Sequence, residues 1–338
     1  AAFLRHNTVA KMRNACSIYT QFLLKRTVLK GYPVEIIIDP INVCNFRCPL
    51  CVTGQRLNSR PAGRMPFDQF TRILDELAPW LYKLRFYSWG EPLLHEDIYR
   101  MIGYATSKNV ATEMSSNFSN FRPDDADTLI ESGLELLIVS LDGATAETYA
   151  QYRQGGDFEK VLDNVRALTA AKRRKGSRFP TVEIQCLAMK HNEHELDDMD
   201  RLIVELGADR LRIPPVVVNT LDKEQVERWL PVNEKLSRYD YRTMADKIFD
   251  GRSRCAWLWR SAVINWDGTV SPCCVFEGPK TDMGSLANSS FMDVWNSETY
   301  RSARELFRSG GSAASVRTIC TKCKGSPHAA DRKQQGLY

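Results

Sequence analysis

Three cysteines lie within eight residues of this chain, because "CNFRCPLC" contains Cys44, Cys48 and Cys51. Three thiolates on one short loop can hold a metal centre. A structural zinc ion needs four ligands, whereas a cubane iron–sulfur cluster held by three cysteines leaves one iron without a protein ligand. The spacing therefore predicts a cluster with a reactive iron, and the alternative is a zinc loop completed by a distant fourth ligand.

A second group of cysteines lies in the last quarter of the chain. Four thiolates on two separated elements can close the shell of a metal centre, as an iron–sulfur cluster or as tetrahedral zinc. The stretch "INWDGTVSPCC" between these elements is typical of a β-hairpin that turns at Asp267-Gly268. The candidate ligands are Cys255, Cys273, Cys320 and Cys323, and Cys274 is left over.

The composition indicates where the protein works. The chain has ten cysteines and no export signal at its start, which favours metal binding over disulfides and predicts a cytoplasmic protein. No run of 18 uncharged apolar residues occurs, so no transmembrane segment is expected. The net charge of +5 is spread along the chain, and its densest cluster, "KRRKG" at 172–176, suits a helix end. Nucleic acid is therefore not an expected partner.

The stretch from Cys16 to Leu29 has the pattern of an amphipathic helix, with Ile18, Phe22, Leu23 and Leu29 on one side. We expect this helix to pack across the rest of the fold. A weak contact with a membrane surface is the alternative.

Six β-rich runs alternate with helical patterns between the two cysteine groups. This alternation predicts parallel βαβ units, arranged as a barrel or as an open sheet. The expected strands are 34–39, 84–89, 111–117, 134–142, 181–189 and 210–218, and the expected helices are 67–80, 98–108, 124–132, 157–175 and 193–206.

Polar or chemically unusual residues follow nearly every expected strand. They are the cysteine loop, "SWGEP", "SSN", "SLDG" and "KHN". Because the carboxyl ends of parallel strands share one face of such a fold, these five loops are expected to converge on one site.

With these loops in this order, the sequence resembles the radical S-adenosylmethionine (radical SAM) enzymes over roughly residues 34–325. "CNFRCPLC" resembles their C-x3-C-x-φ-C signature, with Leu50 as φ and as a candidate cofactor contact. The resemblance implies an α/β fold, a partial (β/α)6 TIM-like barrel, in which S-adenosylmethionine binds the open iron. It also implies the chemistry: one electron cleaves this cofactor, and the resulting 5′-deoxyadenosyl radical abstracts a substrate hydrogen.

The resemblance implies further cofactor contacts. "SWGEP" stands where the family has a Gly-Gly-Glu motif, so Gly90 and Glu91 are expected at the cofactor, with Glu91 accepting from its ammonium group. Trp89 replaces the first glycine, which the backbone tolerates if its φ is negative. The other implied cofactor contacts are Asn117, Ser140, Asp142, Arg153 and Asn192. Their alternative roles are in turns, helix caps or ion pairs. For Asn192 the alternative is a helix N-cap with Glu195 at its third position.

The C-terminal cysteines resemble the start of a SPASM domain, the auxiliary-cluster extension of these enzymes. No cysteine follows Cys323, so the form resembles the shorter Twitch version, with one auxiliary [4Fe–4S] cluster as an electron relay. The implied cofactors are thus two [4Fe–4S] clusters and S-adenosylmethionine. Cys186 and Cys274 are candidate catalytic hydrogen donors, or alternatively small apolar side chains of the core.

These motifs divide the chain into five expected parts. They are an N-terminal helical segment (1–33), the radical SAM barrel (34–218), a helical linker (219–254), the auxiliary-cluster domain (255–325) and a tail (326–338). The linker aromatics Trp229, Tyr239 and Tyr241 are expected to cover the substrate opening or to pack in the core.

A C-terminal region with a single auxiliary cluster resembles that of a dehydrogenase that oxidises a cyclitol alcohol. A small sugar or cyclitol is therefore the first expected substrate, with oxidation, epimerisation or dehydration as the outcome. Peptide maturation is the alternative within the family, although the segment before the first strand is too short for a typical leader-recognition domain. The alternative outside the family's chemistry is an iron–sulfur electron-transfer or scaffold protein. The expected protein partner is a flavodoxin- or ferredoxin-type reductant.

Overall fold

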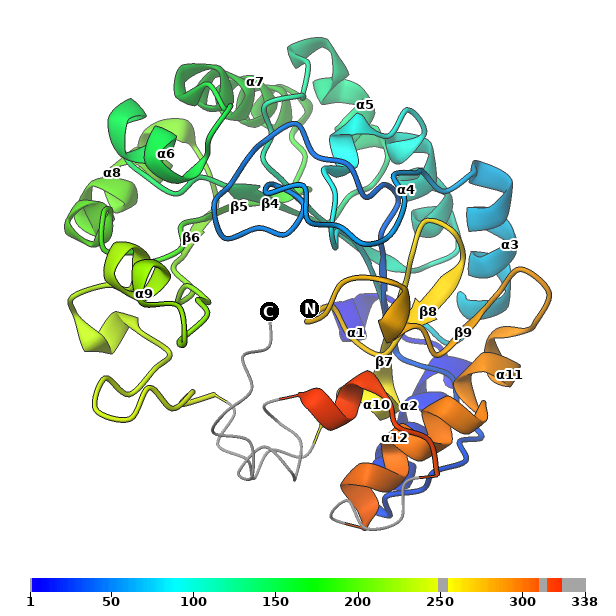
Figure 1. The fold of residues 1–338 in the computed structure, drawn as a ribbon. Helices are drawn as coiled ribbons and strands as arrows, with labels where there is room; N and C mark the ends of the chain where they lie inside the picture. The colour runs from blue at the N-terminus through cyan, green and yellow to red at the C-terminus, as the bar shows by residue number, and fades with distance from the viewer. Residues whose placement is uncertain (1, 249–254, 310–314, 324–338) are drawn as a thin grey trace. The chain divides into compact units, whose positions relative to one another are not determined.

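The computed structural model describes residues 2–248, 255–309 and 315–323, and Figure 1 shows the course of the chain. The chain forms two compact units. Of the described residues, the first contains 2–43, 58–112, 255–309 and 315–323, and the second contains 44–57 and 113–248. The predicted tail (326–338) and the end of the predicted linker (249–254) lie outside the described residues.

The sheet of the first unit has the strand order β2–β1–β7–β8–β9. β1 (Glu35–Ile38) pairs in parallel with β2 (Lys83–Phe86) and with β7 (Ser261–Ile264), so its apolar residues are buried. β7, β8 (Thr269–Ser271) and β9 (Gly284–Ser285) are antiparallel. The hairpin predicted at Asp267-Gly268 is confirmed, because Gly268 has a φ of +80° between β7 and β8.

Helices α3 (Phe67–Leu77) and α4 (Ile98–Ser107) belong to the same unit and pack against each other. The apolar residues of α3 recur at helical spacing, so Phe70, Ile73, Leu74 and Leu77 all face inward and are buried. Both helices agree with the sequence prediction to within a few residues at their ends.

The N-terminal helices are α1 (Ala2–Arg5) and α2 (Val9–Leu23). α2 begins where Thr8 accepts a hydrogen bond from the backbone of Lys11, which is a common N-cap. The predicted boundaries of this helix, 16 to 29, were wrong, because it starts well before Cys16 and ends before Leu24. Ile18 and Leu29 are buried as expected, but Leu23 is half exposed.

The C-terminal part of the first unit contributes three helices, α10 (Trp257–Arg260), α11 (Phe291–Trp295) and α12 (Glu298–Arg308). Arg304 of α12 is fully buried, and its guanidinium donates to the carbonyls of Leu258, Thr27 and Trp295. One side chain therefore joins α12 to α10, to α11 and to the segment that follows α2.

The second unit has the strand order β3–β4–β5–β6, all parallel. The strands are β3 (Ala111–Ser116, of which the last four residues belong to this unit), β4 (Leu136–Ser140), β5 (Thr181–Gln185) and β6 (Arg210–Arg212). Each is shorter than the sequence predicted, because the last residues of the expected runs leave the sheet and enter the loops.

The helices of the second unit alternate with these strands (Figure 1). They are α5 (Ala126–Glu131), α6 (Ala146–Tyr152), α7 (Phe158–Lys175), α8 (Leu196–Leu206) and α9 (Lys223–Trp229). α6 was not predicted, whereas α9 lies within the predicted helical linker. Gly176 and Gly207 end α7 and α8 in the left-handed conformation, which glycine adopts at little cost. In the described part of the chain, no helix is long and apolar enough to cross a bilayer.

A buried arginine ties the segment before α3 to the C-terminal hairpin. Arg60 Nη1 lies 2.5 Å from Asp267 and Nη2 lies 2.6 Å from Asp282, while its side chain is 5% exposed. Burial opposes the charged guanidinium, but the two carboxylates outweigh it and raise the pKa of Arg60. The hairpin thus depends on a charged group held away from water.

We expect Arg60→Met to lower the free energy of unfolding by about 3 kcal/mol, because it leaves two carboxylates without their shared cation. Urea denaturation measures this change. The matched control is Arg64→Met, since Arg64 pairs with Glu96 at an exposed position and should contribute under about 1 kcal/mol. Equal losses in the two variants would contradict the interpretation.

Candidate functional site

The cysteine loop occupies residues 44–57 of the second unit. The Phe46 backbone N–H donates to the Cys44 sulfur at 3.4 Å, and the Cys51 N–H donates to the Cys48 carbonyl. Gly54 packs so closely that a Cβ there would lie 2.6 Å from the backbone nitrogen of Cys48. These contacts fix the backbone of the loop at Cys44, Cys48 and Cys51.

Asn117, at the carboxyl end of β3, contacts this loop. Its Nδ2 donates to Asn45 Oδ1 at 2.9 Å and lies 3.8 Å from the Cys44 sulfur. Asn45 in turn donates to Ser119 Oγ, whose hydroxyl donates to Asn117 Oδ1. The sequence placed Asn117 near a cofactor, and the structure places it beside a cysteine of the predicted cluster.

Asp142 and Arg153 form a buried ion pair that also reaches the loop. Arg153 Nε lies 2.6 Å from Asp142 Oδ2, and Arg153 Nη1 lies 3.8 Å from the Cys48 sulfur. Burial opposes a charged guanidinium, but Asp142 and Cys48 together raise the pKa of Arg153. Burial also raises the pKa of the Cys48 thiol, and Arg153 counteracts this rise. Asp142 therefore holds the Arg153 guanidinium so that it can donate toward the Cys48 sulfur.

Asn192 uses all its polar atoms inside the second unit. Its Oδ1 accepts from the Met189 N–H, and its Nδ2 donates to the carbonyls of Leu187 and Asp142 and approaches the Cys186 sulfur at 3.6 Å. The alternative role as a side-chain cap was wrong, because Asn192 makes no cap hydrogen bond.

Glu195, the other member of that expected cap, has a different role. Its buried carboxylate accepts from the Ala144 N–H and from the hydroxyls of Thr145 and Thr148 at the start of α6. Glu195 therefore fixes the beginning of α6, the helix that is followed directly by Arg153.

Cys186 is fully buried directly after β5, and burial raises the pKa of its thiol. Ser140 is buried at the end of β4, and Leu50 is half-buried within the cysteine loop. Their assignment to the cofactor or to hydrogen donation stays a prediction.

Several aromatic residues with no definite predicted role gather near the ion pair, and the Arg153 guanidinium lies over the Tyr152 ring. Tyr152 contacts Trp229 edge to face at 5.3 Å, and Trp229 makes a similar contact with His191. Within the described residues, both ring nitrogens of His191 are buried without a hydrogen-bond partner, and burial lowers its pKa. The Tyr149 hydroxyl is likewise buried without a described partner. The motif "KHN" after β5 was the available sequence signal for His191.

The other two linker aromatics pack within the fold. Tyr239 is buried, and its hydroxyl donates to the Val218 carbonyl. Tyr241 is half-buried, and its hydroxyl donates to the Pro231 carbonyl.

The Gly90-Glu91 loop lies in the first unit. The Glu91 N–H donates to the carbonyl of Val43, the residue that precedes Cys44, and its buried carboxylate accepts from the Leu93 N–H. A Cβ on Gly90 would lie 1.7 Å from the Ile41 carbonyl oxygen, so only glycine fits. Trp89 does not have a positive φ, so the backbone accommodates tryptophan in place of the first glycine of the Gly-Gly-Glu motif.

Asp39, which the sequence did not single out, fixes this loop. Its Oδ1 accepts from the Trp89 N–H at 3.1 Å, and its side chain is buried. Burial raises the pKa of Asp39 to about 7, while its backbone hydrogen bonds and Arg60 oppose the rise. A carboxyl group directly after β1 thus positions the Gly90-Glu91 turn.

The second cysteine group gathers in the first unit. Burial raises the pKa of the Cys255, Cys273 and Cys320 thiols, and repulsion among these groups and Cys323 raises it further. The pKa of Cys274 is also raised by burial, but the neighbouring charge that acts on it is the Arg85 guanidinium, which opposes the rise. Cys274 also repels Cys273, its neighbour in the chain, so the assignment of Cys273 rather than Cys274 to the set stays a prediction.

Both cysteine sets suit iron–sulfur clusters chemically. Thiols held in apolar surroundings lose their protons when a metal is bound, and N–H groups aimed at the sulfurs stabilise a cluster. Among the residues described, no three Cys, His, Asp or Glu side chains are grouped to hold one metal ion. A cubane cluster does not require such a group, because each of its thiolate ligands binds a different iron.

Comparisons with known families agree with this arrangement. A family model described as the radical SAM superfamily matches residues 38–203, and one described as an iron–sulfur cluster-binding SPASM domain matches residues 255–324. The chain is 24% identical over 331 residues to an AdoMet-dependent heme synthase of Methanosarcina barkeri, covering 85% of this chain and 90% of that protein. It is 28% identical over 295 residues to a mycofactocin maturase of Mycobacterium tuberculosis, covering 81% of this chain and 73% of that protein.

Among solved structures, the fold is similar to Streptococcus suis SuiB bound to its precursor peptide SuiA. The TM-score is 0.63 at 16% sequence identity, over 94% of this chain and 74% of that one. The α/β fold with parallel strands, predicted as a TIM-like partial barrel, is confirmed by this likeness and by the family match.

Gly90→Ala should displace the motif turn, because the new Cβ would collide with backbone rather than with a flexible side chain. We expect a loss of about 1–3 kcal/mol in unfolding free energy and loss of S-adenosylmethionine cleavage, followed as 5′-deoxyadenosine release. Gly176→Ala is the control, since no described atom lies within 4 Å of its Cβ and only the left-handed φ is strained. A Gly90→Ala variant with full activity would refute the role of this turn.

Asp39→Asn should change how stability depends on pH. A carboxyl with a folded pKa of about 7 and an ordinary pKa when unfolded stabilises the fold in its protonated state, and this stabilisation is lost as pH rises toward 7. Between pH 5.5 and 7 the wild type should lose about 2 kcal/mol relative to Asp39→Asn, with little further loss above. Urea denaturation of both proteins measures the difference, and parallel pH profiles would disprove it.

Proposed function

Because the chain belongs to the radical SAM superfamily and carries a C-terminal SPASM iron–sulfur domain, we propose that it oxidises a substrate C–H bond by radical chemistry. The family implies S-adenosylmethionine and two [4Fe–4S] clusters as cofactors. The observation that carries the oxidative proposal is the second set of cysteines, Cys255, Cys273, Cys320 and Cys323, all of which lie within the matched SPASM domain at residues 255–324.

Cys44, Cys48 and Cys51 would hold the first cluster, leaving one iron open for S-adenosylmethionine. When bound and reduced, this cluster supplies the electron that cleaves the cofactor to methionine and a 5′-deoxyadenosyl radical. Asn117 and the Phe46 N–H donate toward Cys44, and Arg153, oriented by Asp142, donates toward Cys48. Such donors stabilise negative charge on cluster sulfurs and favour the reduced state.

The remaining cofactor contacts follow from the buried polar groups. Glu91 is placed by Val43 and Leu93 with its carboxylate out of water, where it would accept from the ammonium group of S-adenosylmethionine. Asn192 has no spare polar atom, so we assign it to the support of Asp142 and Cys186 rather than to direct cofactor contact.

Net oxidation requires that the substrate radical lose one electron and one proton after the hydrogen atom is removed. The four thiolates Cys255, Cys273, Cys320 and Cys323 would close the auxiliary cluster, which suits it to accept the electron rather than to bind substrate. His191 is the described residue best suited to take the proton, because burial keeps its imidazole neutral and both nitrogens lack described hydrogen-bond partners.

For the substrate we propose a peptide. The support is the likeness to SuiB, a structure bound to a precursor peptide, and to a mycofactocin maturase. The sugar or cyclitol expected from the sequence finds no support among these relatives. The protein partner that supplies electrons would be a flavodoxin or ferredoxin, and a reducing cytoplasm would keep the ten thiols available.

The experiment that tests the function combines the reduced, reconstituted protein with S-adenosylmethionine and one class of candidate at a time. The candidates are peptides encoded beside the gene and, separately, small polyols. A peptide that raises 5′-deoxyadenosine formation and loses two mass units supports the proposal. Stimulation by a polyol alone would replace the peptide, and no cleavage under any condition would favour a scaffold or electron-transfer role.

The two cysteine sets should respond differently to substitution. Replacing Cys44, Cys48 and Cys51 together by Ala should abolish cofactor cleavage and halve the iron from about eight to about four per chain. Replacing Cys320 and Cys323 by Ala should also remove about four irons while cofactor cleavage persists and substrate oxidation stops. Cys16→Ala, at an exposed position outside both sets, is the control. Zinc in place of the second four irons would remove the electron acceptor from the mechanism.

A further inference from the structure

The segment that precedes Glu35 has an unusual charge. It contains six of the chain's 46 lysines and arginines and none of its 41 acidic residues, since Glu35 is the first acid. Its formal charge of +6 exceeds the +5 of the whole chain. The positive charge is therefore concentrated here, and the even spread expected from the sequence was wrong for this segment.

The same segment exposes much apolar surface. Half of the large apolar side chains that are exposed in the described part of the chain lie between Phe3 and Val28. On α2, Val9, Met12, Tyr19 and Leu23 recur at helical spacing on the outward face, and Tyr19 is 63% exposed. An ordinary surface helix places polar residues on this face.

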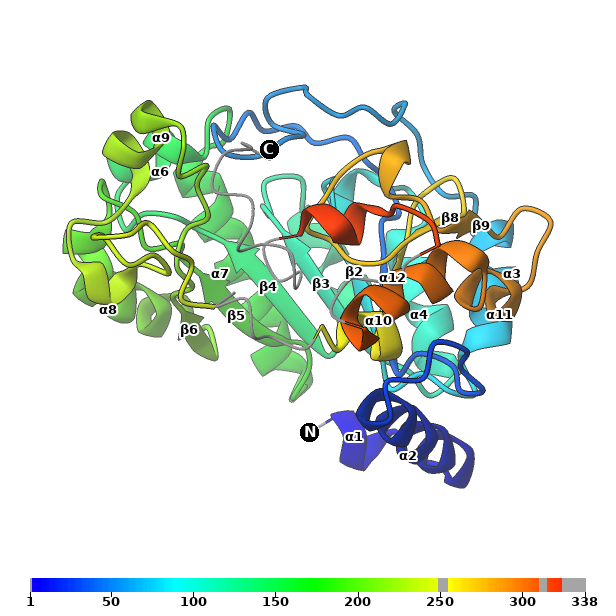
Figure 2. The ribbon, with the colours of Figure 1, turned by 60° about the horizontal axis from the view of Figure 1, so that its bottom comes forward.

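The opposite face of α2 holds the helix to the first unit, so the exposed stripe is not needed for packing. Asn14 exchanges two hydrogen bonds with the backbone of Tyr32, and Ile18 is buried. Phe22 contacts Trp259 of α10 edge to face. Figure 2 shows α1 and α2 at the margin of this unit.

The segment after α2 presents a second row of side chains. Its backbone is fixed from within, because Trp259 donates to the Arg26 carbonyl, Arg304 donates to the Thr27 carbonyl, and Asn296 bonds both backbone polar groups of Leu29. The alternate side chains, Arg26, Val28 and Lys30, are exposed. A cation, an apolar group and a cation are thus held in a fixed row.

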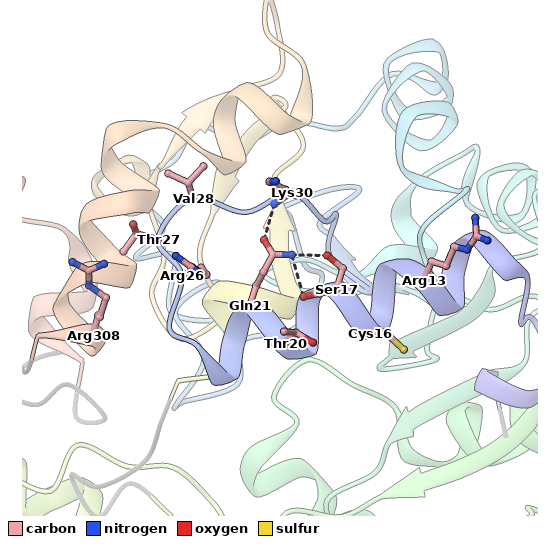
Figure 3. Close-up of a pocket in the computed structure, with 10 residues that line it drawn as sticks. All are labelled: Arg13, Cys16, Ser17, Thr20, Gln21, Arg26, Thr27, Val28, Lys30 and Arg308. Carbon is pink, nitrogen blue, oxygen red and sulfur yellow. Dashed lines mark hydrogen bonds between the residues drawn. The ribbon is translucent and has the colours of Figure 1, made fainter.

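A pocket of about 830 Å³ lies between this row and α2 (Figure 3). Gln21 of α2 connects the helix to this row, because its side-chain amide donates to Ser17 and its side-chain oxygen accepts from the Lys30 backbone N–H. The pocket is lined by four cations, Arg13, Arg26, Lys30 and Arg308, and by the hydroxyl groups of Ser17 and Thr20. Within the described residues, Arg308 pairs with Glu305, whereas Arg13, Arg26 and Lys30 have no carboxylate partner. The pocket offers several donors to an anion, and no acid lines it.

We propose that α2 and the segment up to Lys30 form a docking surface for an anionic phospholipid membrane. The pocket takes the phosphate of a lipid headgroup, and the outward apolar side chains enter the interface between headgroups and acyl chains. Basic residues beside exposed apolar groups are the pattern by which helices lie on anionic bilayers. This surface is separate from the proposed radical chemistry and does not depend on it.

An acidic polypeptide would also be attracted by these cations, but it would leave the apolar stripe unexplained. Charged side chains of such a partner would meet Val9, Met12, Tyr19 and Leu23 on the outward face of α2. A bilayer satisfies both features, because its phosphates accept from the cations and its interior accepts the apolar groups.

The test is flotation of the reconstituted protein with vesicles of phosphatidylcholine alone and of phosphatidylcholine mixed with phosphatidylglycerol. Binding should require the anionic lipid and weaken at high salt. Arg26→Glu with Lys30→Glu should lower the partition coefficient at least about twenty-five-fold, since each basic residue contributes a factor of about five. Tyr19→Ser with Leu23→Ser should lower it more than about tenfold.

Matched controls separate this surface from general effects of charge and hydrophobicity. Lys160→Glu with Arg173→Glu, both exposed on α7, and Val204→Ser with Leu221→Ser, both exposed elsewhere, should bind as the wild type does. No binding to anionic vesicles, or equal loss in test and control variants, would overturn the proposal. Preferential binding of a poly-glutamate peptide that the Tyr19/Leu23 variant retains would replace the membrane with an acidic polypeptide.

Discussion

The buried ion pair between Asp142 and Arg153 holds together most of the second unit's site. Asp142 accepts from the Leu187 N–H after β5, and its carbonyl accepts from Asn192, while Arg153 reaches the Cys48 sulfur from the end of α6. Breaking such a pair leaves an uncompensated buried charge. The ion pair therefore fixes four parts of the second unit relative to one another, namely the end of β4, the end of β5, α6 and the cysteine loop.

The first unit uses charge in a similar way. Asp39 fixes the turn at Gly90, and Arg60 holds the hairpin that leads to Cys273. Arg304 and Asn296 join the C-terminal helices to the segment after α2. The auxiliary-cluster region and the N-terminal surface thus share one set of buried polar contacts, so the exposed row beside α2 is anchored to the core of its unit.

The alternation of strands and helices, the two cysteine sets and the hairpin turn were all predictable, because each is a local pattern with few alternatives. Strand ends were predicted too long, since apolar residues such as Leu187 and Met189 continue the run of β5 in sequence although the strand ends at Gln185. α6 was missed because a short helix carries too few turns for a periodic signal. The start of α2 was missed because Thr8 was not recognised as its cap.

By itself the sequence predicted the kind of chemistry, since the spacing of Cys44, Cys48 and Cys51 favours a cluster with an open iron, while the four C-terminal cysteines fit either an iron–sulfur cluster or zinc. Tertiary structure decided what surrounds those sulfurs. The pairing of Asp142 with Arg153, the raised pKa of Asp39 and the burial of His191 depend on contacts between residues distant in the chain. The outward row beside α2 likewise depends on which face packing leaves free. Spacing along a chain fixes local ligand geometry, but the dielectric and the partners of each group arise only on folding.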